Sequence, residues 1–498
     1  MAKSDYIWWL FIVVGVVLRL KLYIANRSFW ADEASLALNL VNRTFTGLTQ
    51  PLDYEQASPI LFLFIEKALL TVLGNKDYIL RLLPLLAGLL SVYLMYRVAR
   101  ENLGLVGLFA LALFSVSGFL VYYSSELKQY SSDVMLGLLL VLFASVCLRE
   151  NARIKDFLTL GIAGVIAIWA SHTLIFILTG IGLALACQNL ARKDYTSLSW
   201  ILVSGFAWLI TLTAEYVVSL RYIAADAQLM NYWRKAFMPM PPWSHLGWFR
   251  DTYFSFVFFS MGRSDLFLAL LLLVLALAGG LSIFVRNRYL AITLLLPFIT
   301  VSIASALHRY PLKDRFMLFL APFIFMLMAE GLGRIYSLLA KWHHGVAVVT
   351  SGCIALVVMW LPTYDGFRSL FSPFADTGIR PVIQYVEANR MPGDIVYVFH
   401  GAETGFKYYA PLYNLDNGQV IIGFDTWNKK LALQSFLDDV DVLKGNSRVW
   451  FIFSDIVDCG GCTGNMQAFY VKYLDQFGTQ LDKFNAQDAN GYLYDLRP

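Results

Sequence analysis

Residues 26–39 read NRSFWADEASLALN and follow directly on the first hydrophobic segment of the chain. Asp32 and Glu33 stand side by side in this stretch, next to Trp30 and ahead of an amphipathic run. The presence of two adjacent carboxylates just outside the point where a chain leaves a bilayer requires an explanation. We interpret them as the catalytic edge of a membrane-embedded enzyme.

The composition is that of a polytopic membrane protein. Of the 498 residues, 58% are hydrophobic and 15% are charged, and the mean hydropathy is +0.59. A soluble domain has roughly 45–50% apolar and about 25% charged residues. The net charge is only +4, and the basic residues stand in short clusters between apolar runs. That pattern indicates topology signals and argues against nucleic-acid binding.

A helix needs about 20 apolar residues to cross a bilayer, and eleven segments of the chain are predicted to do so. They are residues 6–25, 78–97, 105–122, 134–147, 157–170, 174–190, 198–220, 266–285, 290–306, 316–337 and 346–361. The apolar run 58–74 is short and carries Glu66 and Lys67. It is predicted to lie in the membrane interface without crossing it.

Basic residues predict the orientation of these spans. Clusters such as Arg97 with Arg100 fall in alternate loops, which the positive-inside rule assigns to the cytoplasm. The N-terminus is then cytoplasmic, and the loops that hold Asp32, Glu126 and Arg309 are outside. An odd number of spans places the C-terminus outside as well.

The composition changes from about residue 376, where the apolar runs shorten to strand length. Strands are predicted at 395–399, 420–424 and 449–453, with helices at 380–389 and 429–443. Such alternation predicts a small α/β domain. We therefore expect a transmembrane domain over residues 1–363 and an extracytoplasmic α/β domain over residues 364–498.

Two interpretations of the acidic pair stay open. Asp32, with Glu33 as companion, could take a proton from a hydroxyl group, and like charges this close would raise one pKa toward neutrality. Alternatively, the pair could cap the amphipathic helix that begins near Ala34, because Asp is a good N-cap and acids favour a first helical turn.

A second acidic patch, YYSSELKQYSSD, occupies residues 122–133 between two predicted spans. If residues 126–133 are helical, their spacing places four side chains on one face: Glu126, Gln129, Tyr130 and Asp133. That face could complete a polar cavity, with Lys128 reaching a phosphate. The alternative is a polar hairpin that only separates two helices.

The third element is the expected outer loop HRYPLKDR at residues 308–315, with the cations Arg309, Lys313 and Arg315 around Tyr310. Basic residues on the outside break the positive-inside trend, and this exception indicates an anionic partner. A lipid phosphate or diphosphate at headgroup level would serve. Ordinary anchoring to lipid headgroups is the alternative.

A divalent metal is a weaker hypothesis. Asp53 and Glu55 lie in the first outer loop and could bind such an ion together with Asp32 or Glu126, since carboxylates suit hard cations. Nothing in the spacing determines the number of ligands.

Two further features have alternatives of their own. His172 stands at an outer helix end and could line a site, although a lone His there is more often a packing or capping residue than a ligand. Cys459 and Cys462 form a lone C-x-x-C. In an oxidising compartment this predicts a local disulfide, since it is half a zinc site at best.

The order of these elements is similar to that of a known superfamily. A first span is followed by FWADEA, then by DYEQASP with an apolar run, then by YILRLLPLLAGLLSVYLMYRVAR. YYSSELKQYSSD and, much later, RYPLKDRFMLFLAPFIFMLMAEG follow. Over roughly residues 1–340 this layout resembles the GT-C superfamily of polyprenyl-phosphate-sugar-dependent glycosyltransferases. It looks closest to bacterial protein O-mannosyltransferase and aminoarabinose-transferase types.

The resemblance implies an active site at the outer membrane face and a sugar donor on a polyprenyl phosphate. It implies that Asp32 is the base or orients the acceptor hydroxyl, with Glu33 beside it, and that Glu126 or Asp133 is the second-loop acid. The expected substrate-binding residues are Lys128, Tyr130, His172, Arg309, Tyr310, Lys313 and Arg315. The expected partners are the lipid-linked donor, a glycan, lipid or protein acceptor, and membrane lipids, in a bacterial inner membrane.

A transporter or flippase for a lipid-linked or anionic substrate is the main alternative, because ionisable groups inside a membrane usually mark a pathway. The polar clusters here gather at one predicted face instead of the midplane. No inverted repeat is visible in the sequence. Both observations favour the enzyme.

Overall fold

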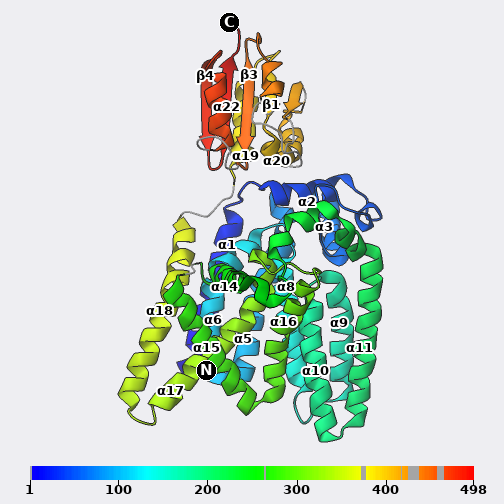
Figure 1. Cartoon of the computed structure of the whole chain (residues 1–498), viewed down its shortest axis with the longest axis vertical. Coiled ribbons are helices and arrows are strands. Elements are labelled where there is room, and N and C mark those ends of the chain that lie inside the picture. Colours follow the sequence, from blue (N-terminus) through cyan, green and yellow to red (C-terminus); the bar gives the residue numbers. More distant parts are fainter. Residues whose placement is uncertain (1–2, 263–264, 372–376, 417, 424–436, 457–464) are drawn as a thin grey trace.

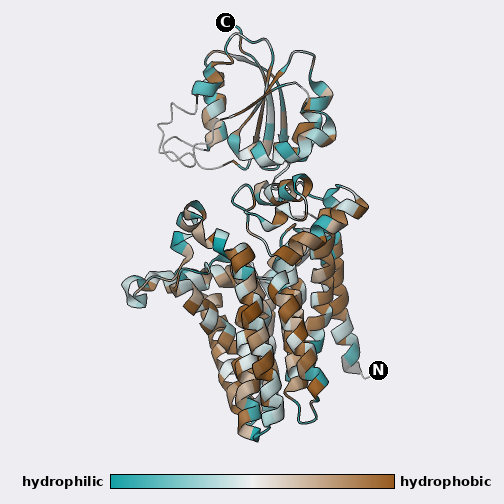
Figure 2. Cartoon of the chain, turned by 90° about the vertical axis from the view of Figure 1, so that its right-hand side faces the viewer, coloured by the Kyte–Doolittle hydropathy of each residue, from teal (hydrophilic) through white to brown (hydrophobic). Residues whose placement is uncertain are grey.

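The computed structural model describes residues 3–262, 265–371, 377–416, 418–423, 437–456 and 465–498. A helical bundle carries a small α/β domain at one end, which we call the outer end (Figure 1). Hydrophobic residues cover the bundle, and hydrophilic residues are frequent in the α/β domain and in the turns (Figure 2). The predicted Cys459–Cys462 disulfide lies outside the described residues.

The helices of the bundle pack side by side along its long direction (Figure 1). They are α1 (Lys3–Ile24), α5 (Leu82–Leu103), α6 (Gly107–Val116), α8 (Tyr130–Cys147), α9 (Ile154–Ala170), α10 (Leu174–Arg192), α11 (Tyr195–Glu215), α15 (Leu266–Arg286), α16 (Arg288–Ala306), α17 (Ala321–Leu339) and α18 (His344–Phe371).

Nine helical stretches of the described chain are long and apolar enough to cross a membrane. One of them, Leu82–Val116, contains both α5 and α6, which are joined by a 3-10 turn at Gly104–Val106. Another apolar helix, α9, has 17 residues. The chain is therefore a multi-pass helical membrane protein, as predicted, and the count of eleven spans stays a prediction.

Glycine lets α15 and α17 approach closely. A Cβ atom on Gly279 would lie 1.8 Å from the carbonyl oxygen of Leu327, and one on Gly331 would lie 2.0 Å from that of Leu275. Small residues at helix crossings are the usual means of tight packing inside a membrane, where apolar burial alone gives no preference for a partner helix.

Short helices cover the outer end. α2 (Ala31–Asn42) and α3 (Ile60–Leu73) lie across it (Figure 1), and α3 is not among the candidate spans. The position of α3 fits the predicted interfacial helix. After α11 the chain forms a π-helical turn (Tyr216–Leu220), α12 (Arg221–Ala225), α13 (Ala227–Tyr232) and α14 (Leu246–Met261).

The C-terminal domain contains a five-stranded sheet in the order β2-β1-β3-β5-β4. The strands are β1 (Ile395–Val398), β2 (Gln419–Ile422), β3 (Val449–Ser454), β4 (Thr479–Ala486) and β5 (Ala489–Asp495). β1 is parallel to β2 and β3, whereas β5 is antiparallel to β3 and β4. The three predicted strands are present, and the terminal hairpin β4–β5 was not predicted.

The helices of this domain are α19 (Ile379–Asn389), α20 (Glu403–Tyr409), α21 (Asp438–Asp441) and α22 (Met466–Leu474). The first matches the helix predicted at 380–389. The helix predicted at 429–443 falls partly outside the described residues, and its described part contains only the short α21. α18 continues to Phe371, beyond the predicted domain boundary at residue 363.

One hydrophobic core joins this domain to the first outer loop. Phe29 and Leu36 of the loop cluster with Ile379, Val382 and Tyr409 of the domain. The opposite face of the sheet packs in a separate cluster with α22. The α/β domain is therefore seated on α2, directly above the stretch that carries the acidic pair.

Candidate active site

A cavity of about 580 Å³ lies at the outer end of the bundle. Its wall combines the start of α2, the first outer loop, residues 123–133, the outer start of α10, the segment 220–237 and the loop before α17. The predicted site residues that line it are Asp32, Glu55, Lys128, Tyr130, Asp133, His172, Arg309, Tyr310 and Arg315. Glu33, Asp53, Glu126 and Lys313 do not line it.

Asp32 is held between two cations. Its Oδ1 accepts hydrogen bonds from Lys128 Nζ and Gln56 Nε2, both at 3.0 Å, and its Oδ2 accepts one from Arg315 Nη2 at 2.7 Å. Burial raises the pKa of Asp32, but Lys128 and Arg315 together lower it further, so the net shift is downward. Asp32 is therefore ionised at neutral pH, and the expectation that Glu33 raises a pKa here is wrong.

The start of α2 argues against the capping interpretation of Asp32. The N-cap is Trp30, and its side chain makes no capping hydrogen bond. The hydrogen bonds of the Asp32 carboxylate run to side chains across the cavity, so this residue does not cap the helix. Its negative charge still lies favourably at the positive end of the helix dipole.

Glu33 serves a different purpose from the one expected. Successive helix residues point about 100° apart, and Glu33 points away from the cavity. It is 1% exposed and receives Arg81 Nε at 2.8 Å and Arg81 Nη2 at 2.5 Å. The backbone N–H of Leu127 donates to it at 2.8 Å. Glu33 therefore joins the two outer loops, and we withdraw its catalytic assignment.

The second outer loop is only partly helical. α8 begins at Tyr130, so the predicted helical face from Glu126 to Asp133 is wrong. Glu126 is fully buried behind Trp30, whose Nε1 donates to it at 3.3 Å. Burial, followed by the nearby charge of Glu33, raises the pKa of Glu126. Asp133 is the acid of this loop that lines the cavity.

The three cations of the 308–315 loop differ in position and in partners. Arg309 lines the cavity and is exposed, and its guanidinium makes no ion pair with any described residue. Arg315 pairs with Asp32 and stacks over the Trp30 ring, 5.2 Å from its centroid. Lys313 lies outside the cavity, 53% exposed and 3.9 Å from Asp314. Only two of the three expected phosphate ligands therefore face the hollow.

Sequence reasoning missed several cavity partners. Gln56 donates to Asp32 and accepts from Lys128 at 2.6 Å, which links three loop positions. His172 Nε2 lies 3.2 Å from Oε1 of Glu215, a buried acid at the end of α11. The acid inside the predicted span 198–220 was the available signal for this pair, because charges inside apolar spans are costly.

Of the three predicted metal ligands, Asp32 and Glu55 line the cavity and Asp53 does not. Asp53 pairs with Arg43 at 2.8 Å, and its side chain is 64% exposed. Asp32 is already neutralised by two cations. No group of three His, Cys, Asp or Glu side chains within the described ranges forms a metal-binding set. The divalent metal stays a prediction.

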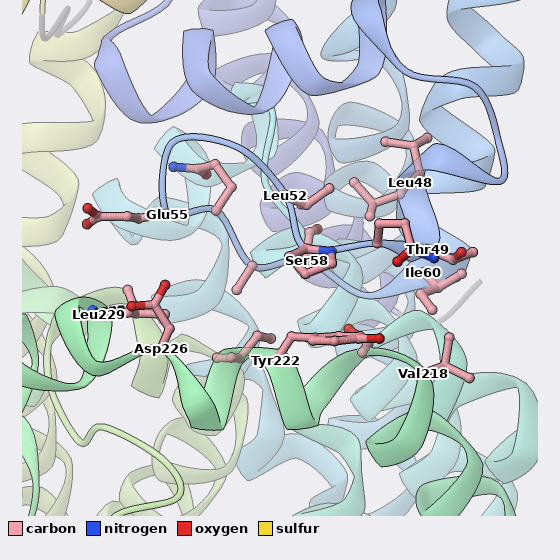
Figure 3. A pocket seen from close by; sticks show the side chains of 17 residues that line it. Leu48, Thr49, Leu52, Glu55, Ser58, Ile60, Val218, Tyr222, Asp226 and Leu229 are labelled. Atoms are coloured by element: carbon pink, nitrogen blue, oxygen red, sulfur yellow. Dashed lines mark hydrogen bonds between the residues drawn. The ribbon is translucent and has the colours of Figure 1, made fainter.

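A small side cavity of about 60 Å³ adjoins the main one. It lies between the first outer loop, with Leu52 and Ser58, and the helical segment that carries Val218 and Tyr222 (Figure 3). Both cavities are lined by Glu55, Gln56, Ala57, Ile223 and Leu229. The hollow therefore extends sideways to the π-helical turn at which α11 ends.

Known proteins share this architecture. The family model of dolichyl-phosphate-mannose-protein mannosyltransferases matches residues 57–216. The crystal structure of ArnT from Cupriavidus metallidurans in the apo state is 12% identical, with a TM-score of 0.56, and the match covers 99% of this chain and 98% of that chain. The chain has the GT-C fold.

Two liganded structures share the GT-C fold with this chain. ArnT bound to undecaprenyl phosphate is 12% identical, with a TM-score of 0.53, over 99% of this chain and 98% of that chain. The archaeal oligosaccharyltransferase AglB from Archaeoglobus fulgidus, in complex with an inhibitory peptide and a dolichol-phosphate, is 11% identical, with a TM-score of 0.51, over 99% and 74%. No curated protein matches the sequence.

The family match covers only part of the cavity, whereas the structural match to ArnT covers 99% of the chain. Residues 57–216 include Lys128, Asp133 and His172. Asp32 and Arg315 lie outside that stretch and join the cavity only through the fold.

Proposed function

We propose that this protein is a membrane glycosyltransferase that moves a sugar from a polyprenyl-phosphate donor to an acceptor hydroxyl. The observation that carries the proposal is the ionised carboxylate of Asp32, held by Lys128 and Arg315 at the wall of a cavity. The same wall contains Arg309, which forms no ion pair with the residues that the structure describes. ArnT with undecaprenyl phosphate and AglB with a dolichol-phosphate support the class of donor.

A phosphate leaving group needs cations. Arg309 is exposed in the cavity and has a free guanidinium fork, which suits two oxygens of a phosphate. Arg315 adds a second guanidinium near Asp32, and its Nε has no acceptor among the described residues. We assign the phosphate of the donor to these two side chains.

The transfer itself needs a base that becomes stronger when the donor is bound. The acceptor oxygen attacks the anomeric carbon, the bond from that carbon to the phosphate oxygen breaks, and the phosphate leaves with the electron pair. The acceptor proton goes to Asp32. A bound phosphate competes with Asp32 for Arg315, and this competition raises the pKa of Asp32 from its low resting value.

Other cavity residues orient the sugar in this proposal. Asp133 is 3% exposed, and its Oδ1 has no hydrogen-bond partner among the described residues, so it is available to a sugar hydroxyl. Tyr130 and Tyr310 supply aromatic walls. The side cavity at the π-helical turn gives a lateral route for a lipid chain or for the acceptor.

The location follows from the same proposal. The basic loops are cytoplasmic, the cavity and the C-terminal domain are extracytoplasmic, and the membrane is a bacterial inner membrane. A lipid-linked donor reaches such a cavity from the outer leaflet.

Purified protein in lipid nanodiscs, incubated with a panel of polyprenyl-phosphate sugars, tests the proposal. We expect release of free polyprenyl phosphate and a matching gain of mass on an acceptor. Asp32→Asn should lower turnover by at least about 100-fold, the usual contribution of a general base. Asp53→Asn, an exposed acid of the same loop, is the matched control and should turn over normally.

Near-normal turnover in the Asp32→Asn variant would refute the assignment of the base. Absence of turnover with every donor, together with counterflow of substrate in vesicles, would replace the transferase with a transporter.

A further inference from the structure

The C-terminal domain meets the membrane bundle through a buried carboxylate that plays no part in the proposed chemistry. Asp77 begins the short helix α4 (Asp77–Leu80) and is 6% exposed. Its Oδ2 accepts hydrogen bonds from Arg380 Nη1 at 2.6 Å and from the Tyr409 hydroxyl at 2.7 Å. Both donors belong to the C-terminal domain, in α19 and α20.

The same two donors reach the stretch that precedes Asp32. The Tyr409 hydroxyl accepts a hydrogen bond from the backbone N–H of Phe29 at 2.8 Å, and Arg380 Nη2 donates to the carbonyl of Asn26. Thr404 of α20 donates to the carbonyl of Ala31 at 3.2 Å. We call Asp77, Arg380 and Tyr409 the Asp77 cluster.

Phe29 shows how tightly this stretch is held. It is fully buried, with the guanidinium of Arg81 4.6 Å from its ring centroid and the ring of Tyr408 5.1 Å away. Arg81 also donates to the carbonyls of Arg27 at 2.6 Å and Ser28 at 3.3 Å. The backbone of residues 26–31 is therefore bonded to the bundle on one side and to the C-terminal domain on the other.

This arrangement leads directly to the candidate active site. Ala31 is the first residue of α2, and Asp32 is the next. Glu33 then accepts from the N–H of Leu127, the neighbour of Lys128. A shift of residues 26–31 would therefore move Asp32 relative to the cations that flank it.

We propose that the Asp77 cluster makes the C-terminal domain part of the active site, with Arg380 and Tyr409 as positioning residues for Asp32. The domain is accordingly no detachable module on a linker: it shares a core with α2 and holds the backbone that leads into the candidate catalytic carboxylate (Figure 1). The catalytic part of this inference rests on the proposed function, whereas the structural part does not.

Two neighbouring tyrosines give a matched test. Tyr409→Phe removes the hydroxyl that bridges Phe29 and Asp77 and keeps the ring. Tyr408→Phe keeps the ring that packs against Phe29 and removes a hydroxyl that donates to Asn75 at 2.9 Å and lies 3.5 Å from Asp77. These partners of the Tyr408 hydroxyl lie outside residues 26–31. The first variant should disturb the stretch before Asp32, and the second should not.

Hydrogen exchange of full-length protein in nanodiscs measures the effect without any substrate. Exchange of the Phe29 amide should rise about tenfold or more in Tyr409→Phe, because a buried N–H loses its acceptor. It should stay within about twofold in Tyr408→Phe, whose lost hydrogen bond lies elsewhere. Equal exchange in both variants would overturn the proposal.

Turnover gives the second measurement. In Tyr409→Phe, kcat should fall about tenfold while KM for the donor changes less than about threefold, because the donor phosphate contacts are untouched. Arg380→Lys keeps the positive charge beside Asp77 but loses the guanidinium group that bonds both Asp77 and the carbonyl of Asn26. Its loss of kcat should be smaller than that of Tyr409→Phe. A rise in KM alone, or an equal loss in both tyrosine variants, would refute the positioning role.

The two proposals fail separately. If the wild-type protein turns over no lipid-linked sugar, the proposed function is wrong, and the exchange measurement still decides whether the C-terminal domain holds residues 26–31.

Discussion

Replacing Lys128 by Met tests the electrostatics of the cavity most directly. Lys128 Nζ lies 3.0 Å from Asp32 Oδ1, and two unit charges at that distance attract by about 5 kcal/mol at an effective dielectric constant of about 20. That figure sets an upper bound of about 4 pKa units. Arg315 stays beside Asp32 in the variant, and one neighbouring cation usually shifts a carboxylate by about 1–3 units. We expect a rise in the pKa of Asp32 of that size.

The sign of the change in activity follows from the role of Asp32. The proposed base must be ionised, and its depressed pKa keeps it ionised in mildly acidic solution. Loss of Lys128 raises that pKa, so the acidic limb of the kcat/KM profile should move to higher pH by about 1–3 units. On the acidic side, activity of the variant then falls at a higher pH than activity of the wild type, while activity at neutral and alkaline pH is retained.

The assay is release of polyprenyl phosphate across the pH range, at donor concentrations below KM, so that the free enzyme is titrated. Lys313→Met, which removes an exposed cation outside the cavity, should leave the limb in place. An acidic limb of Lys128→Met that superimposes on the wild-type limb would show that Asp32 is not the titrating group. Movement to lower pH would contradict the electrostatic argument itself.

Two further substitutions separate binding from folding. Arg309→Gln should raise KM for the donor about tenfold or more with a smaller effect on kcat, because it removes a charge-assisted phosphate contact. Lys313→Gln is the control. An unchanged KM in Arg309→Gln would show that Arg309 does not bind the phosphate. Glu33→Gln should destabilise the protein by about 3–5 kcal/mol, because Arg81 is left buried without its counter-charge. A lowered Tm in detergent would show this, whereas a normal Tm with lost activity would return Glu33 to a catalytic role.

The hydropathy pattern of the sequence was enough to predict much of the fold. Long apolar runs interrupted by basic loops predict a helical membrane protein. A segment can cross lipid only if its backbone N–H and C=O groups are hydrogen-bonded to each other, as they are in a helix. Short apolar runs after residue 376 predicted β1, β2 and β3, which are buried or partly buried. β4 was missed because its residues, TQLDKFNA, are mostly polar and largely exposed at the edge of the sheet.

The sequence was enough to predict which types of residue form the candidate site. The adjacent acids, the YYSSELKQYSSD patch and the cationic loop each stand out from the apolar sequence around them, and each contributes to the cavity. The assignments within these groups were not predictable. Asp32 and Glu33 are neighbours in the chain, yet the direction in which α2 starts sends one into the cavity and the other to Arg81.

Hydrophobic length and periodicity are local properties, so the chain's residues were enough to predict a membrane bundle with a small outer domain and charged groups at one end. Which charges meet depends on the packing of distant segments. Asp32 and Arg315 are 283 residues apart, and Phe29 and Tyr409 are 380 apart. Such pairs depend on how helices and domains pack, and a buried ion pair or hydrogen bond leaves no periodic trace in the chain.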